Sequence, residues 1–231
     1  DLGAALRWTS SRDGVLVGTG AIRTMPTLSV GTHTLTASVT DRDGAPASAS
    51  VTVTVGSAML ALSPEADTYV DAGMPTKAFG TAITLQACSS PVRQMFLRFP
   101  VTGIGSFAVE RAVLRLTVGA KTASASKVGG AVNAIANNAW SETTTTYTTR
   151  PAIDGRTLGT RAAVKAKQVV DFDVTAGLQG DGLYSFALIS TSPDFVTYQS
   201  REATTGRPQL LITLKQNTAP VVAITAPAPG T

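Results

Sequence analysis

Short runs in which apolar and polar residues alternate recur along the whole chain and restrict what it can fold into. In residues 32–40 the apolar Leu35, Ala37 and Val39 are separated by single residues, and residues 48–55 alternate in the same way. Successive side chains of a β-strand point to opposite faces, so such a run buries one face and exposes the other. The pattern predicts strands joined by turns.

Composition supports an all-β chain. Of 231 residues, 43% are hydrophobic and 15% are charged, as in an ordinary soluble globular protein, and the length allows one large or two small domains. Thr, Ser, Gly and Val are frequent, and the Leu-Glu-Lys stretches typical of helices are absent. Residues 174–178 alone suggest a helix, of one turn. The single cysteine, Cys88, cannot form an intrachain disulfide and is expected to be an inert core residue.

Three segments are expected, namely residues 1–56, 60–215 and 217–231. The first contains Trp8 and two Asp-Gly turns, and it resembles the later strands of a bacterial immunoglobulin-like or PKD-like repeat. The Pro-rich third segment resembles the first strand of the next repeat. Such a sandwich has about seven strands, so its first strands should precede Asp1, and the chain is expected to be an internal fragment. We predict that the C-terminal strand folds back, or crosses to a neighbouring molecule, and supplies the missing edge.

The central segment carries short motifs that are distinctive in combination. They are Glu-Ala-Asp-Thr-Tyr-Val at 65–70, Phe-Gly at 79–80, Arg-Gln-Met-Phe-Leu-Arg-Phe at 93–99, Trp-Ser-Glu at 140–142, Thr-Tyr-Thr-Thr-Arg-Pro at 146–151, Ser-Arg-Glu at 200–202 and Arg-Pro at 207–208. Together they resemble the DNRLRE domain, which overlaps carbohydrate-binding module family 96. Tyr147 stands where that family usually has a second tryptophan.

The resemblance implies a jelly-roll β-sandwich of two antiparallel sheets that binds polysaccharide and is not an enzyme. It implies alginate or another uronate polymer as the ligand. It also implies a secreted bacterial parent protein, extracellular or at the cell surface, that degrades or binds polysaccharide. A structural or adhesive spacer in a multidomain surface protein is the alternative, and a polysaccharide lyase is the second alternative.

Residues able to carry catalysis are few. His33 is the only histidine and is far in sequence from Cys88, which excludes Ser-His-Asp and Cys-His catalysis. Asp171 and Asp173 share one face of a predicted strand, where two acids are more often solvated or part of an ion site than glycosidic catalysts. A lyase needs a tyrosine with a lowered pKa, and nothing in the sequence lowers one. We therefore predict no catalytic residue.

The net charge of the chain indicates the sign of its partner's charge. Nineteen Lys and Arg against fifteen Asp and Glu give a net charge of +4 and a pI near 9.5, which favours an anionic ligand. The basic residues are scattered singly and form no nucleic-acid motif, so no nucleic-acid partner is predicted. No stretch approaches the roughly 20 apolar residues that span a bilayer, so no membrane insertion is predicted.

Arginine meets a uronate carboxylate with two parallel hydrogen bonds, which makes it the preferred cation for such a ligand. Arg98 alternates with Leu97 and Phe99, so it is expected to face outward beside Phe96. The predicted ligand-binding residues are Arg98, Arg115, Arg201, Arg93, Arg150, Lys77 and Trp140. Two alternatives stay open: Arg98, Arg115 or Arg201 could form structural ion pairs with Glu110, Glu142 or Glu202, and Trp140 could be buried packing.

A structural calcium ion is the one cofactor that the residues suggest. Asp67 and Asp71 are the predicted metal ligands, because Ca²⁺ prefers carboxylate oxygens and Asp67 lies in a family motif. No EF-hand spacing is present, and Asp67 could instead accept a backbone hydrogen bond at a sheet edge. One histidine and one cysteine make zinc an unsuitable ion.

Overall fold

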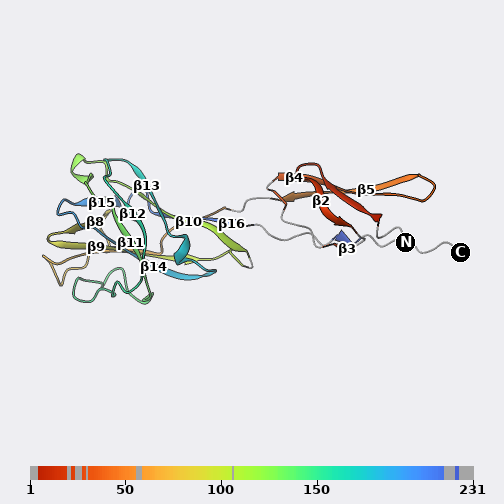
Figure 1. The fold of residues 1–231 in the computed structure, drawn as a ribbon. Helices are drawn as coiled ribbons and strands as arrows, with labels where there is room; N and C mark the ends of the chain where they lie inside the picture. The colour runs from red at the N-terminus through yellow and green to blue at the C-terminus, as the bar shows by residue number, and fades with distance from the viewer. Residues whose placement is uncertain are drawn as a thin grey trace. The chain divides into compact units, whose positions relative to one another are not determined.

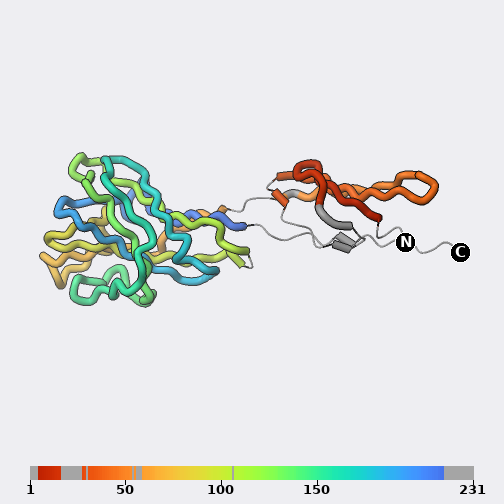
Figure 2. The backbone as a smooth tube through the Cα atoms, in the orientation of Figure 1, coloured from red at the N-terminus to blue at the C-terminus, as the bar shows by residue number. Residues whose placement is uncertain are grey.

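The computed structural model describes residues 5–19, 22–23, 28–29, 31–55, 59–105, 107–215 and 222–223. The chain divides into two compact units (Figures 1 and 2). The first comprises Asp1–Ala58 with Lys215–Thr231, and the second comprises Met59–Leu214. The part of the chain that the structure describes contains no helix with the length and apolar character needed to cross a bilayer.

The first unit is built on a four-stranded antiparallel sheet with the order β2-β1-β4-β5. These strands are β1 (Arg7–Ser10), β2 (Gly14–Thr19), β4 (Gly31–Thr40) and β5 (Pro46–Val55). The C-terminal β17 (Val222–Ala223) pairs with β3 (Ile22–Arg23) in a separate two-stranded sheet, so it does not extend the edge of the four-stranded one. The immunoglobulin-like assignment of this unit stays a prediction.

The core of the first unit lies on one face of this sheet. A buried cluster is formed by Trp8, Leu16, Leu28, Leu35 and Ala37. The alternation of β4 correctly predicts that Leu35 and Ala37 are buried on the same face.

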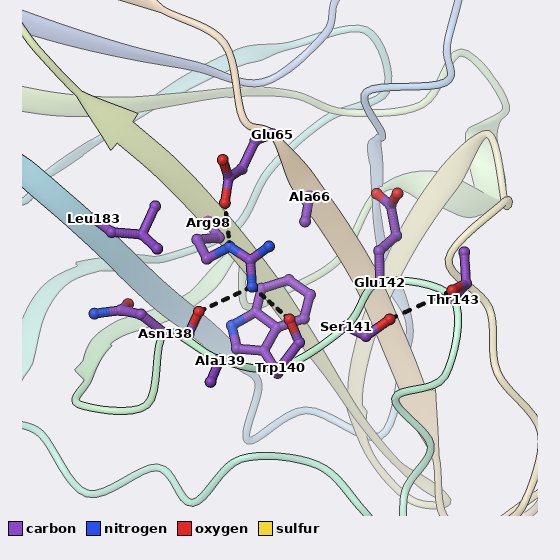
Figure 3. A pocket seen from close by; sticks show the side chains of 10 residues that line it. All are labelled: Glu65, Ala66, Arg98, Asn138, Ala139, Trp140, Ser141, Glu142, Thr143 and Leu183. Carbon is purple, nitrogen blue, oxygen red and sulfur yellow. Dashed lines mark hydrogen bonds and ion pairs between the residues drawn. The ribbon is translucent and has the colours of Figure 1, made fainter.

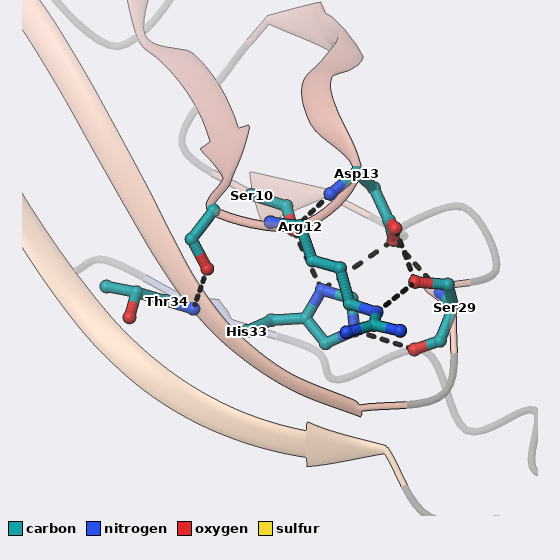
Figure 4. Close-up of polar contacts among 7 residues, drawn as sticks. Ser10, Arg12, Asp13, Ser29, His33 and Thr34 are labelled. Atoms are coloured by element: carbon teal, nitrogen blue, oxygen red, sulfur yellow. Dashed lines mark hydrogen bonds and ion pairs between the residues drawn. The ribbon is translucent and has the colours of Figure 1, made fainter.

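His33 belongs to this buried part of the first unit (Figure 4). Its Nδ1 lies 2.8 Å from Ser10 Oγ, and its Nε2 lies 2.6 Å from the backbone oxygen of Ser29. Asp13 accepts two hydrogen bonds from Ser29, which lower the pKa of that carboxyl. The histidine therefore joins strands β1 and β4 to the segment at Ser29, and it has a structural role.

The second unit is a jelly-roll β-sandwich. Eight of its strands are β6 (Met59–Leu62), β9 (Val92–Val101), β10 (Ala108–Thr117), β11 (Gly130–Ile135), β12 (Thr157–Arg161), β13 (Val169–Asp173), β14 (Gly182–Ile189) and β16 (Gln209–Lys215). One sheet has the order β6-β16-β10-β13 and the other contains β9-β14-β11-β12. If these eight strands alone are numbered 1 to 8 in chain order, the two sheets have the orders 1-8-3-6 and 2-7-4-5. These are the two interleaved Greek keys of a jelly roll. The predicted fold class is confirmed.

Three further strands enlarge the second sheet around β9. β7 (Ala66–Asp71) pairs with β9 along the edge that β14 does not use, and β8 (Thr84–Ser89) forms a tight hairpin with the start of β9. β15 (Val196–Gln199) pairs with β8. Two single-turn 3₁₀ helices complete the unit, and the second, Thr175–Gly177, lies within the predicted turn.

Both faces of β9 are buried, which the alternation alone does not reveal. Leu97 and Phe99 point to the side where Phe186 also lies, with the Phe99 and Phe186 rings 6.2 Å apart. Phe96 points the opposite way and is also fully buried, in a second cluster that includes Trp140. The prediction that Arg98 faces solvent beside Phe96 is therefore wrong, because the segment around Trp140 covers this face of the sheet.

Candidate functional site

Arg98 holds the covering segment onto the sheet (Figure 3). Its guanidinium donates to Glu65 Oε1 and to the backbone oxygens of Asn138 and Trp140, and it stacks 5.0 Å from the centre of the indole of Trp140. Only 16% of the side chain is exposed. The protein itself uses these donors, so Arg98 acts first as a structural residue.

Trp140 is packing and not an exposed platform. It is 6% exposed, its ring centre lies 6.2 Å from that of Phe96, and its Nε1 donates to Ser185 Oγ at 3.0 Å. The hollow beside it has a volume of about 470 Å³ and is lined by two acids, Glu65 and Glu142. The one cation among its lining residues, Arg98, is already paired with Glu65, so it is not available to an anionic ligand.

The remaining predicted cations lie apart from one another. Arg115, on β10, donates from Nε and Nη2 to Asp171 on β13 at 2.8 Å each, and this lowers the pKa of that carboxyl. Arg201 donates to Glu142 at 2.7 Å. Both side chains are thus neutralised by partners within the module.

Arg150 and Lys77 lie against aromatic rings. The Arg150 guanidinium lies 3.8 Å from the ring centre of Tyr147 and donates to Gln94 Oε1, and Lys77 Nζ lies 5.1 Å from the ring centre of Phe79. The seven predicted ligand-binding residues therefore do not converge on one surface. Their assignment as ligand residues stays a prediction.

A groove at the β8–β15 edge of the sandwich combines the groups that saccharide recognition uses. Thr84 and Gln86 on β8 lie opposite Gln199 and Thr197 on β15, and these four side chains form its floor. They alternate with buried residues such as Tyr198, so the period of two places them all on the outer face. The groove has a volume of about 480 Å³.

The rim of this groove is basic and aromatic. Arg93 stacks 4.4 Å from the ring centre of Phe195, pairs with Asp71 at 2.8 Å and donates to Gln86 Oε1. Lys121, from the segment before η2 (Thr122–Ser124), is exposed and has no ion pair among the described residues. No acidic side chain is among the residues that line the groove. We call this surface the β8–β15 groove.

Three carboxylates converge at another place in the module. Oxygen atoms of Asp67, Glu142 and Glu202 lie within 4.8 Å of one another. Asp67 is 1% exposed, and burial, together with these two acids, raises its pKa to about 8. Asp71, the other predicted metal ligand, is outside this cluster, because its two oxygens accept hydrogen bonds from Gly73 and Arg93.

Two of the tyrosines, Tyr69 and Tyr198, have a raised pKa, the opposite of what a lyase base needs. Burial raises the pKa of Tyr198, whose hydroxyl donates to the backbone oxygen of Gly129, and burial also raises the pKa of Tyr69. The hydroxyl of Tyr184 donates to the backbone oxygen of Gly180 at 2.9 Å. These hydroxyls act as hydrogen-bond donors that fix the fold.

Sequence reasoning found only Arg93 of the β8–β15 groove. Lys121, Phe195 and Gln199 carry no motif. The alternation of β15 read together with its pairing to β8 could have found Phe195 and Gln199, but it gives no signal for Lys121, which precedes η2. Glu142 and Glu202 were predicted as ion-pair partners of arginine and not as metal ligands. Their proximity to Asp67 depends on loops whose course the sequence pattern does not give.

The family model of carbohydrate-binding module family 96 matches residues 58–214, which is more than half of the chain. The jelly-roll unit is therefore a carbohydrate-binding module, a class of noncatalytic domain whose partner is carbohydrate. The chain belongs to carbohydrate-binding module family 96. No curated protein matches the chain.

Two solved structures are weakly similar to the chain. One concerns the promiscuous specificity of carbohydrate-binding modules from the β-sandwich superfamily. It is 11% identical, covers 90% of this chain and 83% of its own, and has a TM-score of 0.23. The other is CBM51-2 in complex with GlcNAc and INT domains from Clostridium perfringens ZmpB, with 13% identity, coverage of 94% and 45%, and a TM-score of 0.24. TM-scores this low do not establish a common fold, so the assignment rests on the family match.

Proposed function

We propose that the module binds an anionic polysaccharide, of the uronate class that includes alginate, in the β8–β15 groove. The observation that carries this proposal is the composition of the groove: an unpaired lysine, an arginine stacked on an aromatic ring, amide and hydroxyl side chains on the floor, and no lining acid. Such a surface offers an apolar contact for a sugar ring and donors for its hydroxyl and carboxylate groups.

Two other hollows of the module support this choice by contrast. In the hollow beside Trp140 the one lining cation, Arg98, is paired with Glu65, and the hollow at Arg115 and Arg207 has no aromatic residue. Arg115 in that hollow is already paired with Asp171. Of these three, the β8–β15 groove alone combines an aromatic ring with a cation, Lys121, that has no ion pair among the residues that the structure describes.

The biological setting belongs to the same proposal. A module of this kind serves a secreted or cell-surface bacterial protein, in which attached domains degrade or hold the polysaccharide. A shallow groove binds weakly, and repetition of modules in one parent chain strengthens such binding.

Affinity electrophoresis and calorimetry of the full chain test the proposal against alginate, polygalacturonate and a neutral glucan, in a buffer containing EDTA. We expect retention by the uronate polymers, weakened as salt rises because exposed charges are screened. Lys121→Ala should weaken binding about fivefold, equivalent to about 1 kcal/mol. Gln199→Ala should weaken it as well, and Lys165→Ala, an exposed lysine outside the groove, is the matched control.

Three outcomes contradict the proposal. Retention by the neutral glucan alone would show that charge does not select the ligand, and unchanged affinity of Lys121→Ala and Gln199→Ala would move the site elsewhere. Absence of retention by every polymer would favour a structural spacer. Release of unsaturated products absorbing in the ultraviolet would make the protein a lyase.

A further inference from the structure

Asp67, Glu142 and Glu202 come from three separate parts of the module. Asp67 is on β7, Glu142 follows Trp140 in the segment that covers the sheet, and Glu202 follows β15. Hydrogen bonds join the three: the backbone N–H of Asp67 donates to Glu142 Oε1 at 2.8 Å, and the backbone N–H of Arg201 donates to Asp67 Oδ2 at 2.7 Å. These bonds hold the carboxyl groups facing one another.

Two oxygens in this cluster have no hydrogen-bond partner among the residues that the structure describes. These are Asp67 Oδ1 and Glu202 Oε2, which are both buried. Because Asp67 is only 1% exposed, solvent does not readily replace the missing partner of its oxygen. A buried carboxylate oxygen that no donor satisfies is costly, and such groups are usually paired or coordinate a metal. The second oxygen of Asp67 is already used by Arg201. The unsatisfied oxygens therefore point to a missing positive partner.

The charges of the cluster do not balance without a cation. The Arg201 guanidinium lies 2.7 Å from Glu142 and 3.7 Å from Glu202, and the contact of Arg201 with Asp67 is through its backbone N–H. Three carboxylates and one guanidinium leave a formal charge of −2, which a divalent cation would neutralise.

We propose that Asp67, Glu142 and Glu202 form a calcium site that joins β7 to the segment after Trp140 and to the segment after β15. Oxygens on one Ca²⁺ at about 2.4 Å lie at most about 4.8 Å apart, in agreement with the separation within 4.8 Å found here. The donors are all carboxylate oxygens, which suit Ca²⁺, and no histidine or cysteine is among them. Water and backbone oxygens complete its shell of six to eight ligands.

Calorimetry and thermal unfolding of the full chain test this site, with EDTA-treated protein and Ca²⁺ alone. No polysaccharide is present, because uronate polymers bind calcium themselves and because this result must not depend on the proposed ligand. We expect one Ca²⁺ per chain and a rise of several degrees in Tm on adding the ion, since a ligand that binds only the folded state stabilises it. Mg²⁺ should bind more weakly, because it requires near-octahedral geometry at shorter distances and loses its hydration water reluctantly.

The variant Glu202→Gln should lose at least about tenfold in calcium affinity and most of the calcium-dependent rise in Tm, because it removes one charged ligand. It spares the hydrogen bonds of Glu142 to Asp67 and Arg201, so we expect it to fold. Glu110→Gln, on the exposed surface of β10, is the matched control. Wild-type protein without calcium binding, or a Glu202→Gln variant with unchanged affinity, would overturn the proposal.

Discussion

Arg98 illustrates how an arginine in a segment that resembles a family motif can be used by the fold. Arg98 binds Glu65, two backbone oxygens of the covering segment and the indole face of Trp140. An arginine that binds a sugar would keep most of its guanidinium N–H groups free for the ligand, whereas those of Arg98 are bound within the protein. At this position the family motif and the folding requirement coincide.

We predict that Arg98→Ala destabilises the protein without a specific effect on polysaccharide affinity. The loss of charge-assisted hydrogen bonds and of the cation–π contact should lower the free energy of unfolding by about 2 to 3 kcal/mol. Urea unfolding measures this change. Arg98→Lys should recover only part of the loss, because a lysine cannot bind Glu65 and two carbonyls with a planar fork.

The exposed Arg111 provides the control for this experiment. It has no ion pair among the described residues, so Arg111→Ala should change stability by less than about 0.5 kcal/mol. If Arg98→Ala unfolded like the wild type and bound uronates more weakly, Arg98 would be a ligand residue after all.

The alternation of each strand predicts which side chains share a face, and it does so correctly for Leu97 and Phe99 on β9 and for Leu114 and Leu116 on β10. It does not predict what covers the second face. Phe96 and Arg98 are on a face that a single sheet would expose, and the segment around Trp140 covers them. That covering depends on contacts between residues about 40 positions apart, for which a local pattern has no signal.

In the candidate sites, too, a local pattern predicts some features, and others depend on contacts between distant parts of the chain. Cys88 is buried, and burial raises the pKa of its thiol, as expected of an inert core cysteine. The β8–β15 groove required the pairing of two strands that lie far apart in the sequence. The carboxylate cluster required three segments to meet, so only Asp67 could be named in advance.

Two segments meet closely at Gly80, before β8. A Cβ atom there would overlap the backbone carbonyl of Glu142, so only glycine permits this approach. We predict that Gly80→Ala forces the segment after Trp140 away from the sheet. The variant should lose about 1 to 3 kcal/mol of stability and should bind Ca²⁺ more weakly, because Glu142 moves with its backbone.

Denaturant unfolding and calcium titration measure both effects in the same variant. Gly180→Ala is the matched control, since a Cβ at that position meets no atom within 4 Å. A Gly80→Ala protein with wild-type stability would show that the segment can relax without cost, and it would contradict the assigned role of this glycine.

At the scale of the whole molecule, the jelly-roll unit closes its own core. Both of its sheets are composed of strands between Met59 and Lys215. We predict that residues 59–215, expressed alone, fold cooperatively and retain the calcium and uronate affinities of the full chain. Circular dichroism, thermal unfolding and calorimetry measure this, and a fragment that aggregates or loses calcium affinity would show that the first unit is needed.

The covering segment has a consequence for how the module can change during evolution. Residues 138–142 contribute a buried indole, the carbonyl partners of Arg98 and one carboxylate of the cluster, so most substitutions there would be selected against for stability. The stretch 120–123, beside the β8–β15 groove, is exposed and consists of Ala, Lys, Thr and Ala. Mutations in it would alter ligand preference at little cost to folding, which makes it the natural place to diversify or engineer the specificity of the module.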